Sequence, residues 1–397
     1  MVHLGALLVV ASLVTISVAS PPAQLDHTPQ QQDKGAPHGN KKPLPPPSWK
    51  LLNTGSKARF RGLAPVSELV AWVSGTNGTV LRTEDGGLTF VSVGPSSSSE
   101  KEDEIPVQEL DFRDIEAWSA THAVILSIGS GSESSIYYTH DGGISWTKSF
   151  ANGETEAFYD CFAFEDRNSR HGMAMSDPVG GKFRLIETWD AGESWRIVDD
   201  RERMPPAVEG EFGFAASGTC IATAAGRWYM ATGGVNPGRI FRSNDKNGYD
   251  WDVSNTSIPG NESGGVFSVQ FRDAKHGIAV GGDFQNPAGN RDNAVYSVDG
   301  GRTWMAAEKF PSGYRSGSAW VAVPVSGGGC GFGLSNMALA VGPTGSDFTI
   351  DRGRTWHTFD NGSFDSVECV TSKSKGKGKG KVCWASGQDG RVAKLPL

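Results

Sequence analysis

The chain is organised around residues 297–304, which read Ser-Val-Asp-Gly-Gly-Arg-Thr-Trp. The aspartate can accept hydrogen bonds from nearby backbone N–H groups, and the two glycines permit positive φ angles. The Thr-Trp pair that follows suits the first residues of a strand. The stretch therefore predicts a tight turn between two antiparallel β-strands.

This turn motif recurs along the chain. Further copies lie at residues 83–90, 139–146, 188–195 and 349–356, and a degenerate copy with one extra residue lies at 243–251. The aspartates of the six copies are Asp85, Asp141, Asp190, Asp245, Asp299 and Asp351. Because the turns repeat, we expect these aspartates to be structural, each satisfying the hydrogen bonds of its own turn.

The spacing of the turns predicts a β-propeller. The repeat is roughly 40 to 56 residues long, which matches a four-stranded blade. Strands led by an aromatic residue begin the repeats, at Phe60, Phe112, Tyr159, Phe214, Phe267, Tyr314 and Phe364. One antiparallel meander per repeat gives an all-β, seven-bladed propeller. The last repeat lacks a fourth strand, and residues 48–52 are expected to supply it, so that the N- and C-terminal strands close the ring.

The regions outside the repeats indicate a secreted protein. Residues 1–19 contain an apolar run followed by small residues, as in a signal peptide. Residues 20–47 are rich in Pro, Gln and Gly, which predicts a disordered leader before a propeller at 48–397. Four N-glycosylation sequons begin at Asn77, Asn255, Asn261 and Asn361. We expect an extracellular protein with no membrane span after signal cleavage.

Charge and cysteine content narrow the classes of partner. The net charge of −7 argues against a general nucleic-acid or anionic-membrane binder, and a soluble monomer is expected.

Cys369 and Cys383 bracket a Lys/Gly-rich run and are the candidate disulfide. Cys161, Cys220 and Cys330 cannot be paired from the sequence, and buried free thiols are the alternative. No Cys/His spacing predicts a metal site, and no cofactor is implied.

The turn motif resembles the Asp-box, or BNR, repeat of sialidase-like propellers. Over its ordered length the chain is most similar to the photosystem II assembly and stability factor-like branch of that superfamily. The motifs that carry this similarity are Arg-Phe-Arg-Gly-Leu at 59–63, Asp-Phe-Arg-Asp at 111–114, Gly-Gly-Val-Phe-Ser at 264–268 and Gly-Pro-Thr-Gly-Ser-Asp at 342–347. The resemblance implies a WD40/YVTN-like seven-bladed propeller and, in photosynthetic members, a non-enzymatic assembly role. A secreted protein departs from that setting, so the photosystem partner is not carried over.

Candidate ligand-binding residues follow from the propeller geometry. The first strand of each blade lines the central channel, and its start lies at the rim where loops carry function. The candidates at this rim are Arg61, Arg113, Asp160, Glu211, Ser268, Tyr314, Arg315 and Asp365, with Asp177 and Asp283 on nearby loops. Ionised groups there are partly desolvated and must be paired or occupied. One interpretation is a site for a carboxylate, phosphate or sulfate group; the other is that these residues pair with one another and close the channel.

These observations favour a non-catalytic binding or assembly scaffold for a protein or an anionic or carbohydrate ligand. The alternative is a glycoside hydrolase, sialidase-like or glucan-active, in which Arg61, Arg113 and Arg315 hold a carboxylate beside Tyr314. The Phe/Tyr-Arg-Ile-Pro motif of sialidases is absent, and the sequence places no carboxylate pair at a catalytic separation. An oxidoreductase is less favoured, because the Gly-rich residues 327–333 lack a βαβ context.

Overall fold

The computed structural model describes residues 48–96, 105–165, 170–199, 202–321, 323–324, 332–333, 336–371 and 381–397. The predicted signal peptide (1–19), the leader (20–47) and Cys330 lie outside the described residues. All described residues belong to one compact unit, Pro46–Leu397.

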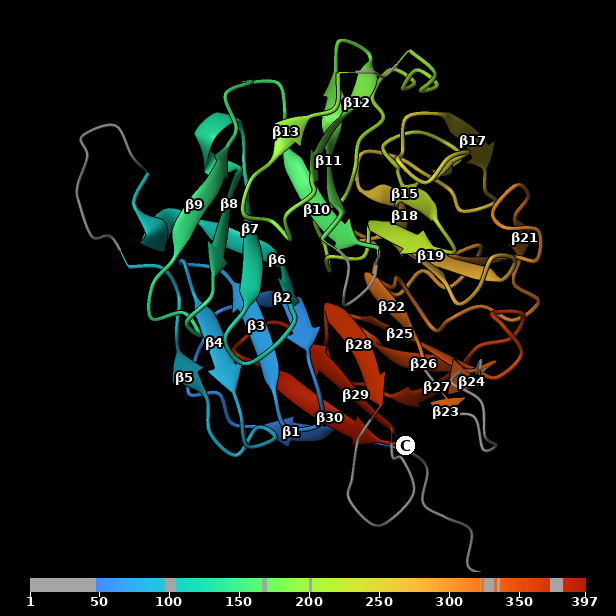
Figure 1. Cartoon of the computed structure of the whole chain (residues 1–397). Helices are drawn as coiled ribbons and strands as arrows, with labels where there is room; N and C mark the ends of the chain where they lie inside the picture. Colours follow the sequence, from blue (N-terminus) through green and yellow to red (C-terminus); the bar gives the residue numbers. More distant parts are fainter. Residues whose placement is uncertain are drawn as a thin grey trace, which may run out of the picture. The chain divides into compact units, whose positions relative to one another are not determined.

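The described strands form seven four-stranded antiparallel blades in a ring (Figure 1). Blade 1 consists of β2 (Phe60–Pro65), β3 (Ala71–Gly75), β4 (Val80–Thr83) and β5 (Val91–Ser92), and blade 2 of β6 (Asp111–Ala117), β7 (Ala123–Ile128), β8 (Ser135–Thr139) and β9 (Thr147–Ala151). Blade 3 consists of β10 (Tyr159–Phe164), β11 (Gly172–Val179), β12 (Lys182–Thr188) and β13 (Arg196–Ile197), and blade 4 of β14 (Ile221–Ala224), β15 (Arg227–Ala231), β16 (Arg239–Ser243) and β17 (Trp251–Asn255).

Blades 5 to 7 follow the same plan. Blade 5 consists of β18 (Gly264–Phe271), β19 (Gly277–Asp283), β20 (Ala294–Ser297) and β21 (Met305–Ala306), and blade 6 of β22 (Gly317–Trp320), β25 (Ala338–Gly342), β26 (Gly345–Thr349) and β27 (His357–Asp360). Blade 7 consists of β28 (Ser366–Thr371), β29 (Lys381–Ser386), β30 (Val392–Pro396) and β1 (Lys50–Leu52). The pair β23 (Val323–Pro324) and β24 (Phe332–Gly333) is inserted in blade 6, and two short 3-10 helices are η1 (Val107–Glu109) and η2 (Gly131–Glu133).

The ring is closed by the two ends of the propeller. Strand β1 pairs antiparallel with β30, with Lys50 opposite Lys394 and Leu52 opposite Val392, and the two strands lie side by side in Figure 1. The first strands of neighbouring blades contact one another around the whole ring, including β28 against β2. The prediction of an all-β, seven-bladed propeller closed by its terminal strands is confirmed. Closure leaves no sheet edge open between the first and last blades.

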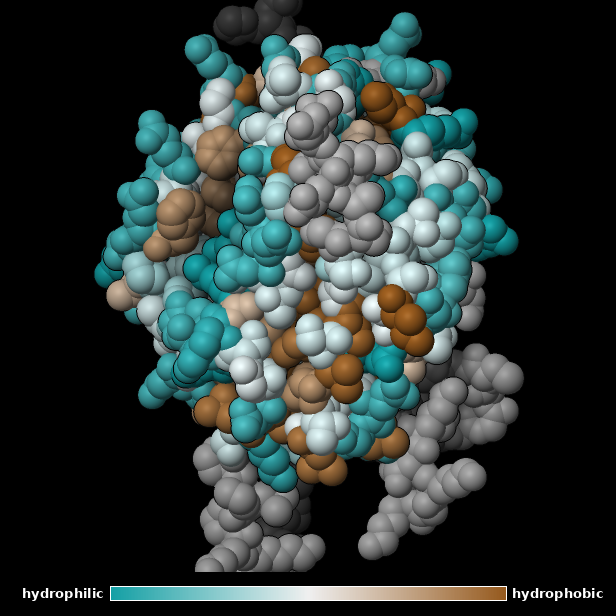
Figure 2. Space-filling model, turned by 90° about the vertical axis from the view of Figure 1, so that its left-hand side faces the viewer, coloured by the Kyte–Doolittle hydropathy of each residue, from teal (hydrophilic) through white to brown (hydrophobic). Residues whose placement is uncertain are grey.

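The apolar core lies between adjacent blades. In one cluster Trp72 of blade 1 packs with Phe112 and Ile115 of blade 2, and in another Trp49 and Phe364 of blade 7 pack with Leu339 of blade 6. A single blade has no interior of its own, so its apolar faces are buried only against its neighbours. On the outer face shown in Figure 2, apolar residues are mixed with hydrophilic ones.

The Asp-box turns are closed by their own side chains. In the box of blade 5, Asp299 Oδ1 accepts from Ser297 Oγ at 2.9 Å and from Thr303 N at 3.0 Å, and Asp299 Oδ2 accepts from Thr303 Oγ1 at 2.6 Å. The same three bonds form at Asp85, Asp141, Asp190 and Asp351, whereas Asp245 accepts from three backbone N–H groups. Each box therefore uses its carboxylate to hold the turn between the third and fourth strands.

Two disulfide bonds cross-link the described strands. Cys369–Cys383 joins β28 to β29 within blade 7, and Cys161–Cys220 joins β10 of blade 3 to the residue before β14 of blade 4. The second pairing is one that the sequence leaves open. None of the helices in the described ranges is both long and apolar enough to span a bilayer. The four sequon asparagines, Asn77, Asn255, Asn261 and Asn361, are all exposed.

Candidate anion site at the channel mouth

A β-bulge at the start of the first strand positions three of the candidate side chains. In β2 the pairing register shifts between Phe60 and Gly62, so Arg61 is the extra residue. The same shift occurs around Arg113 in β6 and around Asp160 in β10. A bulge leaves one residue out of the ladder and re-aims its side chain. The bulge explains why the residue after the leading aromatic differs in role from its neighbours.

Two ion pairs surround these bulges. Arg59 donates from Nε and Nη2 to the two carboxylate oxygens of Asp365, at 2.8 and 2.7 Å. Arg113 donates from Nε to Asp111 Oδ2 at 2.8 Å. Arg59 and Asp111 are additions to the predicted set. Both stand immediately before a leading aromatic, which is the signal that identifies this position. We call Arg59, Arg61, Arg113, Asp111 and Asp365 the channel mouth.

Arg61 is the member of the mouth without a partner. Within the described residues its side chain makes no hydrogen bond or ion pair, and its Nε is buried and unsatisfied. Burial, and then the positive charges of Arg113 and Arg59, lower the pKa of Arg61 to about 10. The guanidinium is therefore still charged at neutral pH, in a place where a charge without a counterion is costly. The arrangement favours entry of an anion beside Arg61.

Two carboxyl groups next to the mouth, those of Asp160 and Asp177, do not form an ion pair with Arg61. Asp160 is buried, with Oδ2 unsatisfied, and its pKa is raised well above the usual range by burial and then by the charge of Asp177. Burial also raises the pKa of Asp177 to about 6. Because Asp160 holds its proton more readily than an exposed carboxyl group, it neutralises little of the positive charge of the arginines.

An aromatic cluster adjoins the basic residues. Phe214 and Phe267 stack with ring centroids 3.8 Å apart, and Tyr314 meets Phe267 edge-on at 4.7 Å. Burial raises the pKa of Tyr314, and the nearby charge of Asp365 adds to the shift while Arg61 opposes it. Tyr314 therefore lies where the aromatic cluster and the channel mouth meet. The charged residues of the mouth therefore adjoin an aromatic cluster in which Phe214, Phe267 and Tyr314 are buried.

The channel below the mouth is closed by residues 213–219, which we call the channel plug. The predicted first strand of blade 4, starting at Phe214, is wrong, because β14 begins only at Ile221. The plug is hydrogen-bonded to Arg113 of blade 2, Asp177 of blade 3, Ser268 of blade 5, Ser316 of blade 6 and Ser366 of blade 7. Gly218 has φ of +70°, and a Cβ there would lie 2.3 Å from Asp114 Oδ1. The plug is thus tied to five of the other blades across the channel.

Three predicted residues do not reach the mouth. Arg315 is fully buried and donates from Nε to Asp347 Oδ2 at 2.7 Å, within blade 6. The side chain of Glu211 is fully buried and pairs with Arg239 of blade 4. Ser268 is fully buried and hydrogen-bonded to Thr219 and Ser318.

The displacement of Ser268 has a local cause. In blade 5 the register shifts between Val266 and Ser268, so the extra residue is Phe267 itself. Phe267 therefore takes the place that Arg61 and Arg113 take in blades 1 and 2, and Ser268 moves one step along the strand. On the loops, Asp283 accepts from Asn261 and Ser263. In the described ranges, no group of three or more His, Cys, Asp or Glu residues is placed to hold a metal ion.

Known proteins share this repeat and this architecture. The BNR/Asp-box repeat model matches residues 137–148, which contain the box of Asp141. The chain is a seven-bladed β-propeller that carries Asp-box repeats. The resemblance predicted from the sequence is therefore confirmed for the repeat and the fold. A comparison with curated proteins gives no match.

Among solved structures, the Asp-box propeller is similar to YCF48 from Cyanidioschyzon merolae, with a TM-score of 0.52 and 15% identity over 87% of this chain and 98% of that one. It is also similar to an ancestral GH74 enzyme, with a TM-score of 0.55 and 12% identity over 86% of this chain, and it covers 45% of that structure. The RRP9 WD40 repeats give a TM-score of 0.55 at 10% identity, over 89% of this chain and 99% of that one. At these identities the similarity establishes the fold alone.

Proposed function

We propose that this protein is a secreted, non-catalytic binding scaffold that holds an anionic group of a protein partner at the channel mouth. The observation that carries the proposal is the half-buried side chain of Arg61, whose Nε is buried and unpaired and whose charge lies near those of Arg59 and Arg113. Arginine presents a planar fork of donors that matches a carboxylate or sulfate group. The other two arginines already have carboxylate partners, so Arg61 is the one with donors to offer.

The aromatic cluster supports a protein partner. Tyr, Phe and Arg side chains concentrate binding energy in protein interfaces, where an apolar anchor fills a pocket beside a charged contact. Phe212 continues the cluster beyond Phe214, and Phe284, which is 48% exposed, continues it beyond Phe267. An acidic peptide that carries an aromatic residue next to its carboxylate would contact both the channel mouth and the aromatic cluster.

The hydrolase alternative loses part of its support in this geometry. Arg315 pairs with Asp347 and does not join Arg61 and Arg113. A tyrosine nucleophile needs activation, whereas burial raises the pKa of Tyr314 and keeps its hydroxyl protonated. The carboxylates of Asp111 and Asp365 are each engaged by an arginine. Hydrolysis of a fluorogenic sialoside or β-glucan by the purified protein would overturn the non-catalytic proposal.

Binding of small anionic probes tests the proposed function. The probes are inorganic sulfate and the tripeptide acetyl-Gly-Phe-Asp, measured by calorimetry at fixed ionic strength against the same tripeptide with an amide in place of each carboxylate. Both anionic probes are expected to bind the wild-type chain, and Arg61→Gln is expected to weaken them roughly tenfold or more. Arg354→Gln is the matched control, because Arg354 is exposed and pairs with Glu308 away from the channel. Equal binding of the amide would contradict the proposal.

A further inference from the structure

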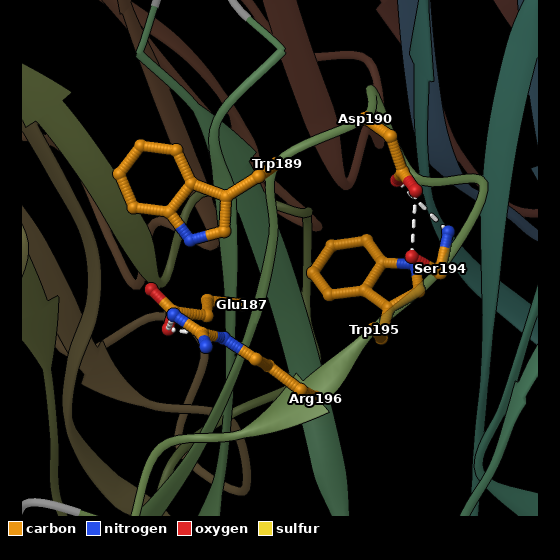
Figure 3. A pocket seen from close by; sticks show the side chains of 6 residues that line it. All are labelled: Glu187, Trp189, Asp190, Ser194, Trp195 and Arg196. Atoms are coloured by element: carbon orange, nitrogen blue, oxygen red, sulfur yellow. Dashed lines mark hydrogen bonds and ion pairs between the residues drawn. The ribbon is translucent and has the colours of Figure 1, made fainter.

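A second site of a different kind lies at the Asp box of blade 3. A pocket of about 410 Å³ is lined by Glu187, Trp189, Asp190, Ser194, Trp195 and Arg196. The box connects the third and fourth strands, so it lies at the opposite rim from the channel mouth, where the first strands start. Figure 3 shows the two indole rings side by side, with the Glu187–Arg196 pair next to them.

Trp189 is unusual for its position in the box. The equivalent residues of the other boxes are Glu84, His140, Asn244, Val298 and Ile350. The Trp189 side chain is 49% exposed, yet one face of its ring stacks on the buried His171 with centroids 3.8 Å apart and planes 9° apart. The indole N–H of Trp189 has no partner among the described residues. The ring is thus held in place while much of its surface is open to solvent, which lowers the entropy lost on binding.

Trp195 is fixed by other contacts. Its Nε1 donates to Gly192 O at 3.1 Å, and its ring stacks along Phe162 at 6.2 Å. The half-buried ring of Trp195 lines the same pocket as Trp189. We call Trp189, Trp195, Glu187 and Arg196 the tryptophan platform.

The charged groups of the platform balance one another. The buried Glu187 accepts from Arg196 Nε at 2.9 Å and from Tyr249 Oη at 2.8 Å. Arg196 Nη2 also lies 2.7 Å from Glu187 Oε1, and the Arg196 side chain is 66% exposed. The Glu187–Arg196 pair thus presents hydrogen-bond donors with no net charge, and the carboxylate of Asp190 adds one negative charge to the lining, which disfavours an anionic ligand.

We infer that the tryptophan platform binds a neutral oligosaccharide. A pyranose ring has an apolar face of C–H groups and a rim of hydroxyl groups. The apolar face matches the open surface of a fixed indole ring, and the hydroxyl groups match the N–H donors of Arg196 and Trp189. Pockets of this size that combine aromatic walls with a few fixed polar groups are typical of small-molecule sites. This inference concerns a different rim and a different ligand from the channel mouth.

The test uses the intact chain and the neutral probes cellotetraose, chitotetraose and mannotetraose, followed by calorimetry and by tryptophan fluorescence. At least one probe is expected to bind the wild-type chain and to change indole emission. Trp189→Ala is expected to weaken that binding roughly tenfold or more, and Arg196→Gln by a smaller factor. Ile350→Ala is the matched control, because Ile350 holds the same box position in blade 6 and is 61% exposed.

Two results would overturn the inference. One is that none of the three probes binds the wild-type chain at millimolar concentration, even if an aromatic peptide does. The other is that Trp189→Ala binds as well as wild type. Arg61→Gln is expected to leave sugar binding unchanged, so failure here is distinguishable from failure at the channel mouth. A melting temperature for each variant shows that it is folded.

Discussion

Arg59 and Asp365 form a bidentate ion pair, with Nε–Oδ2 and Nη2–Oδ1 distances of 2.8 and 2.7 Å, across the junction of the first and last blades. Asp365 is nearly buried, whereas the Arg59 side chain is 38% exposed. Because Asp365 is bound by Arg59, it does not form an ion pair with the nearby Arg61. The Arg59–Asp365 pair therefore has two effects: it links the first blade to the last, and it occupies a carboxylate at the channel mouth.

Asp365→Asn is expected to change stability and anion binding in opposite directions. Losing the ion pair should lower the free energy of unfolding by about 1–2 kcal/mol, because one partner is partly exposed. Removing a negative charge beside Arg61 should tighten sulfate binding by roughly threefold or more. Denaturant unfolding and calorimetry on the same preparation check both effects. Weaker sulfate binding in a folded Asp365→Asn variant would contradict this account of the mouth.

The pKa of Asp177, raised by burial to about 6, predicts a pH dependence. Because the folded state holds this proton more tightly than the unfolded state, its contribution to stability is fully present below pH of about 4 and is lost as pH rises through about 6. Asp177→Asn should flatten that part of a plot of melting temperature against pH. A wild-type curve and a variant curve of the same slope between pH 4 and 7 would contradict the assignment.

The Asp boxes predict sensitivity at lower pH. Hydrogen bonds from Thr89 and Ser145 lower the pKa values of Asp85 and Asp141 to about 2. A lowered carboxylate pKa contributes stability that is present above pH of about 4 and is lost as pH falls toward 2. Asp141→Asn should therefore unfold less steeply in acid than wild type, as followed by tryptophan fluorescence. An unchanged acid transition would show that this box does not contribute to the loss of stability.

The two disulfides are expected to differ in their contribution to stability. Cys161–Cys220 spans 59 residues and joins two blades, whereas Cys369–Cys383 spans 14 residues within one blade. In the loop-entropy model the longer loop contributes about 1 kcal/mol more. The double variant Cys161→Ala/Cys220→Ala should thus lose more free energy of unfolding than Cys369→Ala/Cys383→Ala, measured with guanidinium chloride. The reverse order would contradict the loop argument.

The fold follows from local sequence to a large extent, and the site does so only in part. Each Asp box is closed by residues within eight positions of one another, so its pattern is readable, and its six copies mark six of the seven blades. By contrast, Phe214 looks like the other leading aromatics, and only its distant contacts across the channel make it part of the plug. Arg315 likewise looks like Arg61 and Arg113, and its partner Asp347 lies in another strand. Long-range pairing and a one-residue bulge are therefore what the local pattern leaves undetermined.

The most direct test of the account is the affinity of acetyl-Gly-Phe-Asp for wild type and for Arg61→Gln, measured together with the free energy of unfolding of both. Arg61→Gln is expected to bind the tripeptide roughly tenfold to a hundredfold more weakly than wild type. The variant is also expected to be at least as stable as wild type, because the change removes a half-buried charge that has no ion-pair partner among the described residues. Unchanged affinity, or loss of the fold on replacing Arg61, would contradict the claim that this arginine is held ready for an anion.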